Sequence, residues 1–260
     1  MKLSIVIPVF NSSQILETLI QKIEIHVIRK KKNTQVILVN DHSLDDSWQK
    51  IRDLKKKYEF IKGVNLKKNY GQHSAIFCGL KNCDGDKIVC MDDDMQHDPE
   101  HILKMIDQLD ENDVCYVKYK KREHNYTKIL ISKLNNIVSS FLMEKSSKIY
   151  TSSFKCFNKK ISDQIILNDE NFIFLDYWIF KYAKNITFVE VRHNKRFYGK
   201  TNYGFRELLT LWSKMIFLID VRKGSFRYYI ILVIKNFFKL FLKDYVRYAS
   251  SNKIEISDII

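Results

Sequence analysis

Short apolar runs alternate with helical patterns over the first 119 residues of the chain. The runs are rich in β-branched residues and end in polar or turn-forming residues, which is typical of strands buried on both faces of a sheet. They predict strands at residues 3–10, 34–41, 60–66, 86–94 and 113–119. Apolar residues at three- and four-residue intervals predict helices at residues 13–30, 43–58, 71–83 and 101–109. The alternation predicts an α/β fold with a mostly parallel central sheet flanked by helices.

Polar clusters follow four of the predicted strands. In parallel sheets, ligands bind beyond the carboxyl ends of the strands. One such cluster means little, because strand-end turns need polar residues anyway. Four clusters that converge on one edge predict a ligand site there. They lie at residues 8–11, 40–43, 69–72 and 92–96.

Asp92, Asp93 and Asp94 directly follow an apolar run and repel one another unless a cation neutralises them. In an extended segment, Asp92 and Asp94 would point the same way and face one ion together, with Asp93 turned away. Oxygen ligands suit Mg²⁺ or Mn²⁺, which also take phosphate oxygens from a substrate. The alternative is a solvated acidic turn. Asp41, after the second strand, is suited to accept hydrogen bonds from a base or ribose, or to cap a helix together with Ser43.

The C-terminal part has a different pattern. Residues 226–248 contain no run of about 20 apolar residues, so we expect no spanning helix. A basic stripe recurs every four residues on an otherwise apolar helix, which suits the headgroup region of an anionic membrane or docking on the catalytic domain. A second apolar helix is predicted at 207–219. We therefore expect one folded domain at 1–212 and an amphipathic helical tail at 213–260. The stripe consists of Lys235, Lys239, Lys243 and Arg247.

Composition narrows the possible partners. A chain of 260 residues, 45% of them hydrophobic, can bury one sizeable core. A net charge of +14 favours polyanions: nucleic acid, anionic lipid or phosphorylated small molecules. The chain has no nucleic-acid recognition motif, and the three aspartates would repel a phosphate backbone, so we expect no nucleic-acid partner. Five cysteines without a C-x-x-C pair, and an apolar start at 3–10 too short for a signal peptide, predict a cytoplasmic protein.

Four segments resemble, in order and spacing, the motifs of glycosyltransferase family 2. The branch with the greatest similarity contains the polyprenyl-phosphate and dolichyl-phosphate sugar transferases, which carry Asp-Ala-Asp-Leu-Gln where this chain has residues 92–96. The resemblance covers roughly residues 3–212. The segments are SIVIPVFN (4–11), VILVNDHSLDDS (36–47), NLKKNYGQHSAIFCGL (65–80) and GDKIVCMDDDMQHDPE (85–100).

The resemblance implies a GT-A type nucleotide-diphospho-sugar transferase fold and a metal-dependent donor site. Asp92, Asp94 and Gln96 would hold Mg²⁺ or Mn²⁺ and the diphosphate. Gly71 would let the backbone approach the nucleotide closely. The implied nucleotide-binding set is Pro8, Phe10, Asn11, Asp41, Gly71, Asp92 and Asp93.

Two further stretches fit the branch. Residues 150–155 lie where relatives carry a short segment near the acceptor, which implies acceptor contacts for Ser153 and Lys155. Residues 196–203 resemble an Arg-x-x-Gly-Lys-Ser-x-Tyr loop, in which Arg196 and Lys200 would help to expel the diphosphate.

Other acceptor-side residues are less well matched. After the strand at 113–119 the branch has Gly-x-Arg, and this chain lacks the glycine, which leaves Lys118 and Arg122 as candidates for the acceptor phosphate. Asp176 is a lone carboxylate in an apolar run. It is a candidate general base if the acceptor is a hydroxyl, and otherwise a helix cap or a partnered core aspartate.

These observations predict an inverting transferase. It would move a sugar from a nucleotide diphosphate to a lipid-linked saccharide or a polyprenyl phosphate during cell-surface polysaccharide synthesis, peripherally at the inner face of the membrane. The absence of the relatives' transmembrane pair favours the lipid-linked saccharide. The alternative is a catalytically inactive, glycosyltransferase-like scaffold protein.

Overall fold

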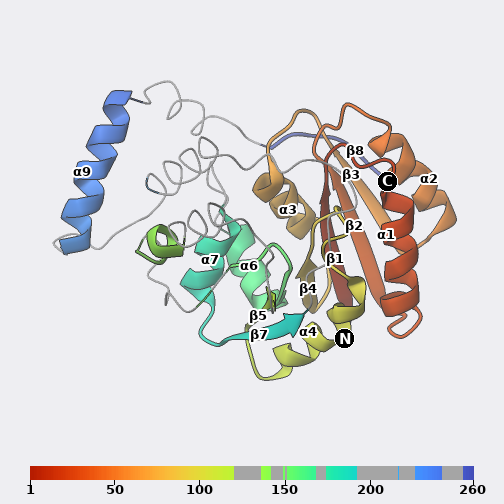
Figure 1. Cartoon of the computed structure of the whole chain (residues 1–260). Coiled ribbons are helices and arrows are strands. Elements are labelled where there is room, and N and C mark those ends of the chain that lie inside the picture. The colour runs from red at the N-terminus through yellow and green to blue at the C-terminus, as the bar shows by residue number, and fades with distance from the viewer. Residues whose placement is uncertain are drawn as a thin grey trace.

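The structure is a computed structural model, and it describes most of the N-terminal two thirds of the chain and parts of the remainder. Figure 1 shows a sheet with helices on both faces and the helix α9 (Phe226–Phe241) standing apart from it. The described residues are 1–119, 136–141, 149, 151–167, 174–191, 216, 226–241 and 254–260.

Eight strands form one sheet in the order β7-β5-β6-β4-β1-β2-β3-β8. Every pair is parallel except the pairs that β6 makes with β4 and β5, and the pair of β8 with β3. The predicted mostly parallel sheet is therefore confirmed. The strands are β1 (Leu3–Val9), β2 (Thr34–Asn40), β3 (Ile61–Leu66), β4 (Lys87–Cys90), β5 (Val114–Tyr119), β6 (Lys155–Asn158), β7 (Ile186–Val191) and β8 (Ile256–Ile259).

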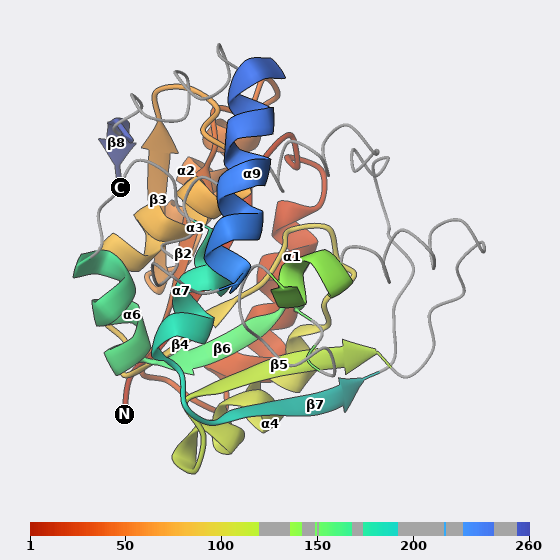
Figure 2. The same cartoon turned by 90° about the vertical axis from the view of Figure 1, so that its left-hand side faces the viewer.

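Two apolar cores cover the two faces of the sheet, because successive side chains of a strand point to opposite faces. In β1, Leu3, Ile5 and Ile7 pack on one side with α1 and α4, whereas Val6 packs on the other side with α3 and α7. Figure 2 shows β4, β6, β5 and β7 side by side in one half of the sheet. The helices are α1 (Leu16–Ile23), η1 (Glu24–Ile28), α2 (Ser47–Lys57), α3 (Gln72–Lys81), η2 (Pro99–His101), α4 (Ile102–Asp107), η3 (Gln108–Asp110), α6 (Lys159–Leu167), α7 (Leu175–Tyr182) and α9 (Phe226–Phe241).

Several boundaries differ from the sequence prediction. The strand predicted at 86–94 ends at Cys90, so the three aspartates lie in an irregular segment after it. The helix predicted at 13–30 begins at Leu16 and ends in the π-helical turn η1. The sequence analysis did not predict β6, β7 or β8.

The C-terminal part is not wholly helical. The helix α9 fits the predicted amphipathic segment, but Ile256–Ile259 form β8, an antiparallel edge strand on β3. The prediction of a helical tail to residue 260 is therefore wrong at its end, because these residues complete the hydrogen bonding of the sheet edge. Within the described ranges, no helix is both long and apolar enough to span a bilayer. The helix predicted at 207–219 lies outside the described residues except for Ile216.

Candidate active site

The carboxyl ends of β1 and β4 form the point at which the strand order reverses. From β1 the chain builds β2 and β3 on one side and then places β4 on the other. The pairing of β1 with β4 ends at Val6, and Pro8, two residues further on, has no N–H to offer a neighbour. The two strands part here, and such a reversal is where open α/β sheets bind their ligands.

The loops after β1, β2 and β4 are bound to one another. The Phe10 N–H donates to Asp93 Oδ2 at 3.2 Å, and the Phe10 side chain is 43% exposed. The Asn11 N–H donates to Ser43 Oγ at 2.9 Å, while Asn11 Oδ1 accepts from the Leu44 N–H at 2.8 Å. Three of the predicted polar clusters therefore meet at one edge.

Backbone strain gathers at the same edge. Among the described residues, the positive φ angles belong to Asn11 (53°), His42 (57°), Met95 (63°) and Gly71 (88°), and each follows a strand end or precedes α3. Such conformations persist where the surrounding structure enforces them, which is typical of binding sites. No described atom lies within 4 Å of the point where a Cβ on Gly71 would stand. Glycine is therefore needed at this position for its φ angle.

Asp41 is buried and fixes the loop before α3. Its two carboxylate oxygens accept hydrogen bonds from the N–H groups of Tyr70 and Gly71, at 2.7 and 2.8 Å. Burial raises the pKa of the Asp41 carboxyl group, and the two N–H groups oppose that rise. The helix-cap alternative is wrong, because α2 begins only at Ser47, after Asp46. A contact from Asp41 to a base or ribose stays a prediction.

The three aspartates have different partners. Asp92 accepts from Gln72 Nε2 at 2.5 Å and from Ser153 Oγ at 2.6 Å. Asp93 accepts from Phe10, and burial of its carboxyl group raises its pKa to about 7. Asp94 is buried and accepts from the Gln96 N–H at 3.1 Å. Asp93 is thus turned toward the β1 loop, as expected, although the irregular segment and not an extended strand turns it.

The donor set fits Mg²⁺ or Mn²⁺ that arrives together with a substrate. Among the described residues, no three His, Cys, Asp or Glu side chains form a ready-made ion site. Magnesium in phosphate-transfer sites is, however, held by one or two carboxylates plus phosphate oxygens. Within the described part of the chain, Asp92 and Asp93 receive hydrogen bonds only from neutral donors and form no ion pair. The carboxylates of Asp92 and Asp93 therefore favour a cation as a further partner.

Asp176 and Lys155 are partners inside the core. Lys155 Nζ lies 2.5 Å from Asp176 Oδ1, and the two side chains are 2% and 8% exposed. The Tyr116 hydroxyl donates to the same oxygen at 2.8 Å, and burial together with the Asp176 charge raises the pKa of Tyr116 well above its usual range. Asp176 has the environment of the partnered core aspartate that the sequence analysis gave as an alternative. The ammonium of Lys155 points into this ion pair.

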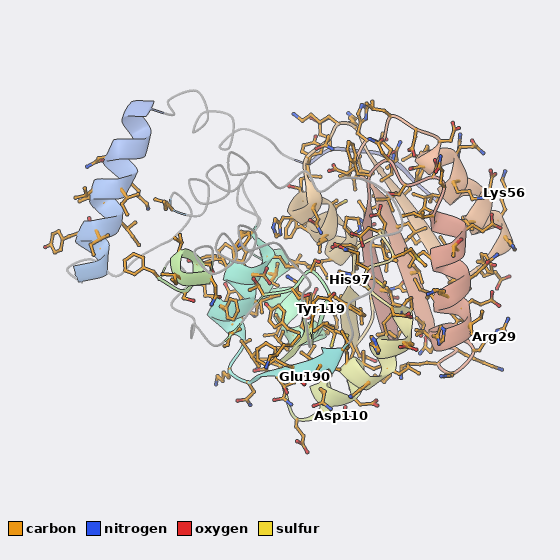
Figure 3. The ribbon with its side chains drawn as sticks, viewed as in Figure 1. Arg29, Lys56, His97, Asp110, Tyr119 and Glu190 are labelled. Atoms are coloured by element: carbon orange, nitrogen blue, oxygen red, sulfur yellow. The ribbon has the colours of Figure 1, made fainter. Side chains whose placement is uncertain are left out.

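The remaining acceptor-side candidates lie at or beyond the ends of β5 and β7. Lys118 is exposed and forms an ion pair with Glu190 on the neighbouring strand at 3.3 Å; Glu190 is labelled in Figure 3. Arg122, Arg196 and Lys200 lie outside the described residues.

Two residues near the aspartates were missed as site residues. Gln72 begins α3 and reaches Asp92, and His97 accepts a hydrogen bond from the Asp92 N–H at 3.1 Å. Both stand inside segments that the sequence analysis quoted. The position of Gln72 at the start of a helix beside a strand-end cluster could have identified it. A buried histidine gives no comparable pattern.

Comparison with known proteins identifies relatives of this chain. A family model described as Glycosyl transferase family 2 matches residues 4–166. An undecaprenyl-phosphate 4-deoxy-4-formamido-L-arabinose transferase from Proteus mirabilis is 28% identical over 217 residues, which cover 83% of this chain and 67% of that protein. Its counterpart from Aeromonas hydrophila is 28% identical over 219 residues, covering 82% and 66%. The match thus spans about two thirds of the relatives' length.

Solved structures share the fold. Glucosyl-3-phosphoglycerate synthase from Mycobacterium tuberculosis, in complex with Mn²⁺, UDP and phosphoglyceric acid, aligns with a TM-score of 0.61 and 14% identity, over 83% of this chain and 76% of that one. S. aureus TarS 1–349 in complex with UDP-GlcNAc aligns with a TM-score of 0.51 and 18% identity, over 94% and 74%. These likenesses confirm the predicted GT-A fold.

Proposed function

The chain belongs to glycosyltransferase family 2, and on that premise we propose that it is an inverting transferase that moves a sugar from a nucleotide diphosphate to a polyprenyl phosphate. The observation that carries the proposal is the meeting of the β1, β2 and β4 loops at the point where the strand order reverses. At this point Asp92 and Asp93 accept hydrogen bonds from neutral donors of the described residues.

We propose that the donor diphosphate binds beside the aspartates and that Mg²⁺ or Mn²⁺ binds with it. Asp92, Asp94 and Gln96 would hold the ion, and the Mn²⁺ in the mycobacterial synthase supports this choice. A divalent ion supplies positive charge that stabilises the departing diphosphate. Phe10 and Asn11, with Asp41 and Gly71 on the other side, would frame the nucleoside. Pro8 contributes by parting β1 from β4.

A polyprenyl phosphate is the preferred acceptor, because the curated relatives are named undecaprenyl-phosphate transferases. This choice replaces the lipid-linked saccharide that the sequence analysis favoured. A phosphate oxygen is already a nucleophile and needs no general base, which agrees with the enclosure of Asp176 in an ion pair. β6 is antiparallel to both β4 and β5, so β5 runs in the same direction as β4 and β1. Lys118, near the carboxyl end of β5, therefore lies at the same edge of the sheet as Asp92. We propose that Lys118 and the segments carrying Arg122, Arg196 and Lys200 meet the acceptor and diphosphate from this side.

We further propose that α9 lies on an anionic membrane surface. Its described apolar side chains include Tyr229, Leu232 and Val233, which are 59%, 39% and 68% exposed. Lys235 belongs to the predicted basic stripe of the same helix. Co-sedimentation with vesicles of anionic lipid tests this contact: Leu232→Ser should reduce binding, and binding to neutral vesicles should be weak for both proteins.

Calorimetric titration with UDP, GDP and dTDP, with and without Mn²⁺, tests the donor site. We expect one nucleotide to bind in the presence of Mn²⁺ and Asp94→Ala to lose that binding. Asp163→Ala, which changes a half-exposed side chain on α6, should retain it. Transfer of a labelled sugar to undecaprenyl phosphate, compared with an undecaprenyl-linked saccharide, then tests the acceptor. A well-folded chain that binds none of the three nucleotides would contradict the proposal and favour the inactive scaffold.

A further inference from the structure

Asp92 is held at three points by side chains from three different segments. Gln72 Nε2 donates to Oδ1 at 2.5 Å, and Ser153 Oγ donates to Oδ2 at 2.6 Å. The backbone N–H of Asp92 in turn donates to His97 Nδ1 at 3.1 Å. Each carboxylate oxygen retains further acceptor capacity, because an ionised carboxylate offers about four lone-pair sites. The Asp92 carboxylate is therefore held in one orientation and can still accept a further bond.

His97 closes a ring of hydrogen bonds behind this carboxylate. A backbone N–H can only donate, so His97 Nδ1 is the acceptor, and the neutral imidazole carries its proton on Nε2. His97 Nε2 lies 3.4 Å from Ser153 Oγ. The direction around the ring is then fixed: Nε2–H points to Ser153 Oγ, and the Ser153 hydroxyl donates to Asp92 Oδ2.

Packing holds the imidazole in this orientation. His97 is 5% exposed. Its ring stacks on Phe154 with the centroids 4.9 Å apart, and it lies parallel to Tyr119 at 6.4 Å; Figure 3 shows His97 and Tyr119 near each other. Phe154 directly precedes β6, which pairs with β4. The two strands that lead to the hydrogen-bonded residues Ser153 and Asp92 are therefore themselves hydrogen bonded.

We propose that His97 and Ser153 are positioning residues that fix the Asp92 carboxylate in the orientation that receives the divalent cation and the donor diphosphate. The inference rests on the proposed function. It assigns the Ser153 hydroxyl to Asp92, where the sequence resemblance implied an acceptor contact. It also gives His97, a residue without a previous role, a place in the donor site. Partners behind a metal ligand commonly change metal affinity by about 10–100-fold when they are removed.

The experiment measures Mn²⁺ affinity in the full chain, by the electron paramagnetic resonance signal of free Mn²⁺, with UDP, GDP or dTDP at saturating concentration. Ser153→Ala removes the hydroxyl, and Ser153→Thr keeps it. His97→Phe keeps the stacking on Phe154 and removes both nitrogens, whereas His101→Phe makes the same change at a half-buried histidine that contacts Glu100. The ¹⁵N spectrum of the imidazoles in the metal-free protein, assigned with His97→Phe, reports which nitrogen carries the proton.

We expect Ser153→Ala and His97→Phe to weaken Mn²⁺ binding about tenfold or more, with Ser153→Thr and His101→Phe close to the unmodified chain. The proton should lie on His97 Nε2. Unchanged Mn²⁺ affinity in Ser153→Ala overturns the proposal even if His97→Phe fails to fold. A proton on His97 Nδ1, assigned with folded His97→Phe, overturns it as well. An unmodified chain that binds no Mn²⁺ with any of the three nucleotides overturns the proposed function and this role with it, whereas the other negative results leave the proposed function standing.

Discussion

Removal of the Asp176 carboxylate distinguishes a structural role from a chemical one. In Asp176→Ala, the Lys155 ammonium, on a side chain that is 2% exposed, loses its counter-charge inside the protein. Removing one member of a buried ion pair costs about 3–5 kcal/mol, because the other charge stays buried alone. The Tyr116 hydroxyl also loses its acceptor. We therefore expect the free energy of unfolding to fall by at least about 3 kcal/mol.

Guanidinium unfolding at neutral pH, followed by circular dichroism, measures this loss. The matched control is Asp163→Ala, which breaks the Lys159–Asp163 pair of 2.6 Å on α6, where the side chains are 50% and 49% exposed. An exposed pair contributes about 0–1 kcal/mol. The double variant Asp176→Ala/Lys155→Met should recover much of the loss, because it removes the stranded charge.

The opposite result would refute this reasoning. If Asp176→Ala unfolds at the same denaturant concentration as Asp163→Ala and yet has no transferase activity, the carboxylate acts in the chemistry. A hydroxyl acceptor would then become the better hypothesis, because only that acceptor needs a general base.

Three further predictions concern the donor edge. The pKa of Asp93 is about 7 in the folded chain and about 3.9 in the unfolded chain, so between these pH values the folded state holds an extra proton. Without metal, the free energy of unfolding should therefore fall as the pH rises through that window. Asp93→Asn should flatten this pH dependence by at most about 4 kcal/mol, measured by urea unfolding at several pH values. Gly71→Ala should lower the melting temperature through backbone strain of about 1–3 kcal/mol, and an unchanged melting temperature would contradict the positive φ. Tyr70 Oη accepts from the Glu255 N–H at 3.0 Å, so Tyr70→Phe should cost about 1 kcal/mol and speed hydrogen exchange in β8, whereas unaltered exchange would refute this anchoring role.

The sequence predicted the first five strands because each is an apolar run that a helix-covered sheet requires. It could not predict β6, since the four-residue strand contains Lys155 and is buried only when Asp176 neutralises that charge. It could not predict β8 either, because all four of its residues are exposed and only the edge of β3 makes them a strand. In both cases the partner lies far along the chain.

The candidate site divides in the same way. Phe10, Asn11 and Asp93 follow strands that the α/β pattern predicts to be parallel, so their meeting at one edge was predictable from the sequence. The contact of Asp92 with Ser153 was not, because Ser153 reaches the aspartates only where β6 runs antiparallel beside β4. The insertion of β6 also places Lys155 in the core beside Asp176, whereas the sequence resemblance alone implied an acceptor contact for Lys155.

The insertion of β6 also explains why the acceptor side is harder to predict than the donor side. After α4 the chain returns in β5, which has the direction of β1, and β6 enters antiparallel between β4 and β5. β7 then pairs with β5 in parallel, with Tyr119 opposite Val191. The chain therefore leaves β5 and β7 at the edge where the aspartates lie, immediately before the segments that carry Arg122 and Arg196. The hydrogen bonding that joins β4 to β5 thus runs through a four-residue strand whose Lys155 is paired with Asp176 in the core, and loss of that pair should impair donor and acceptor binding together.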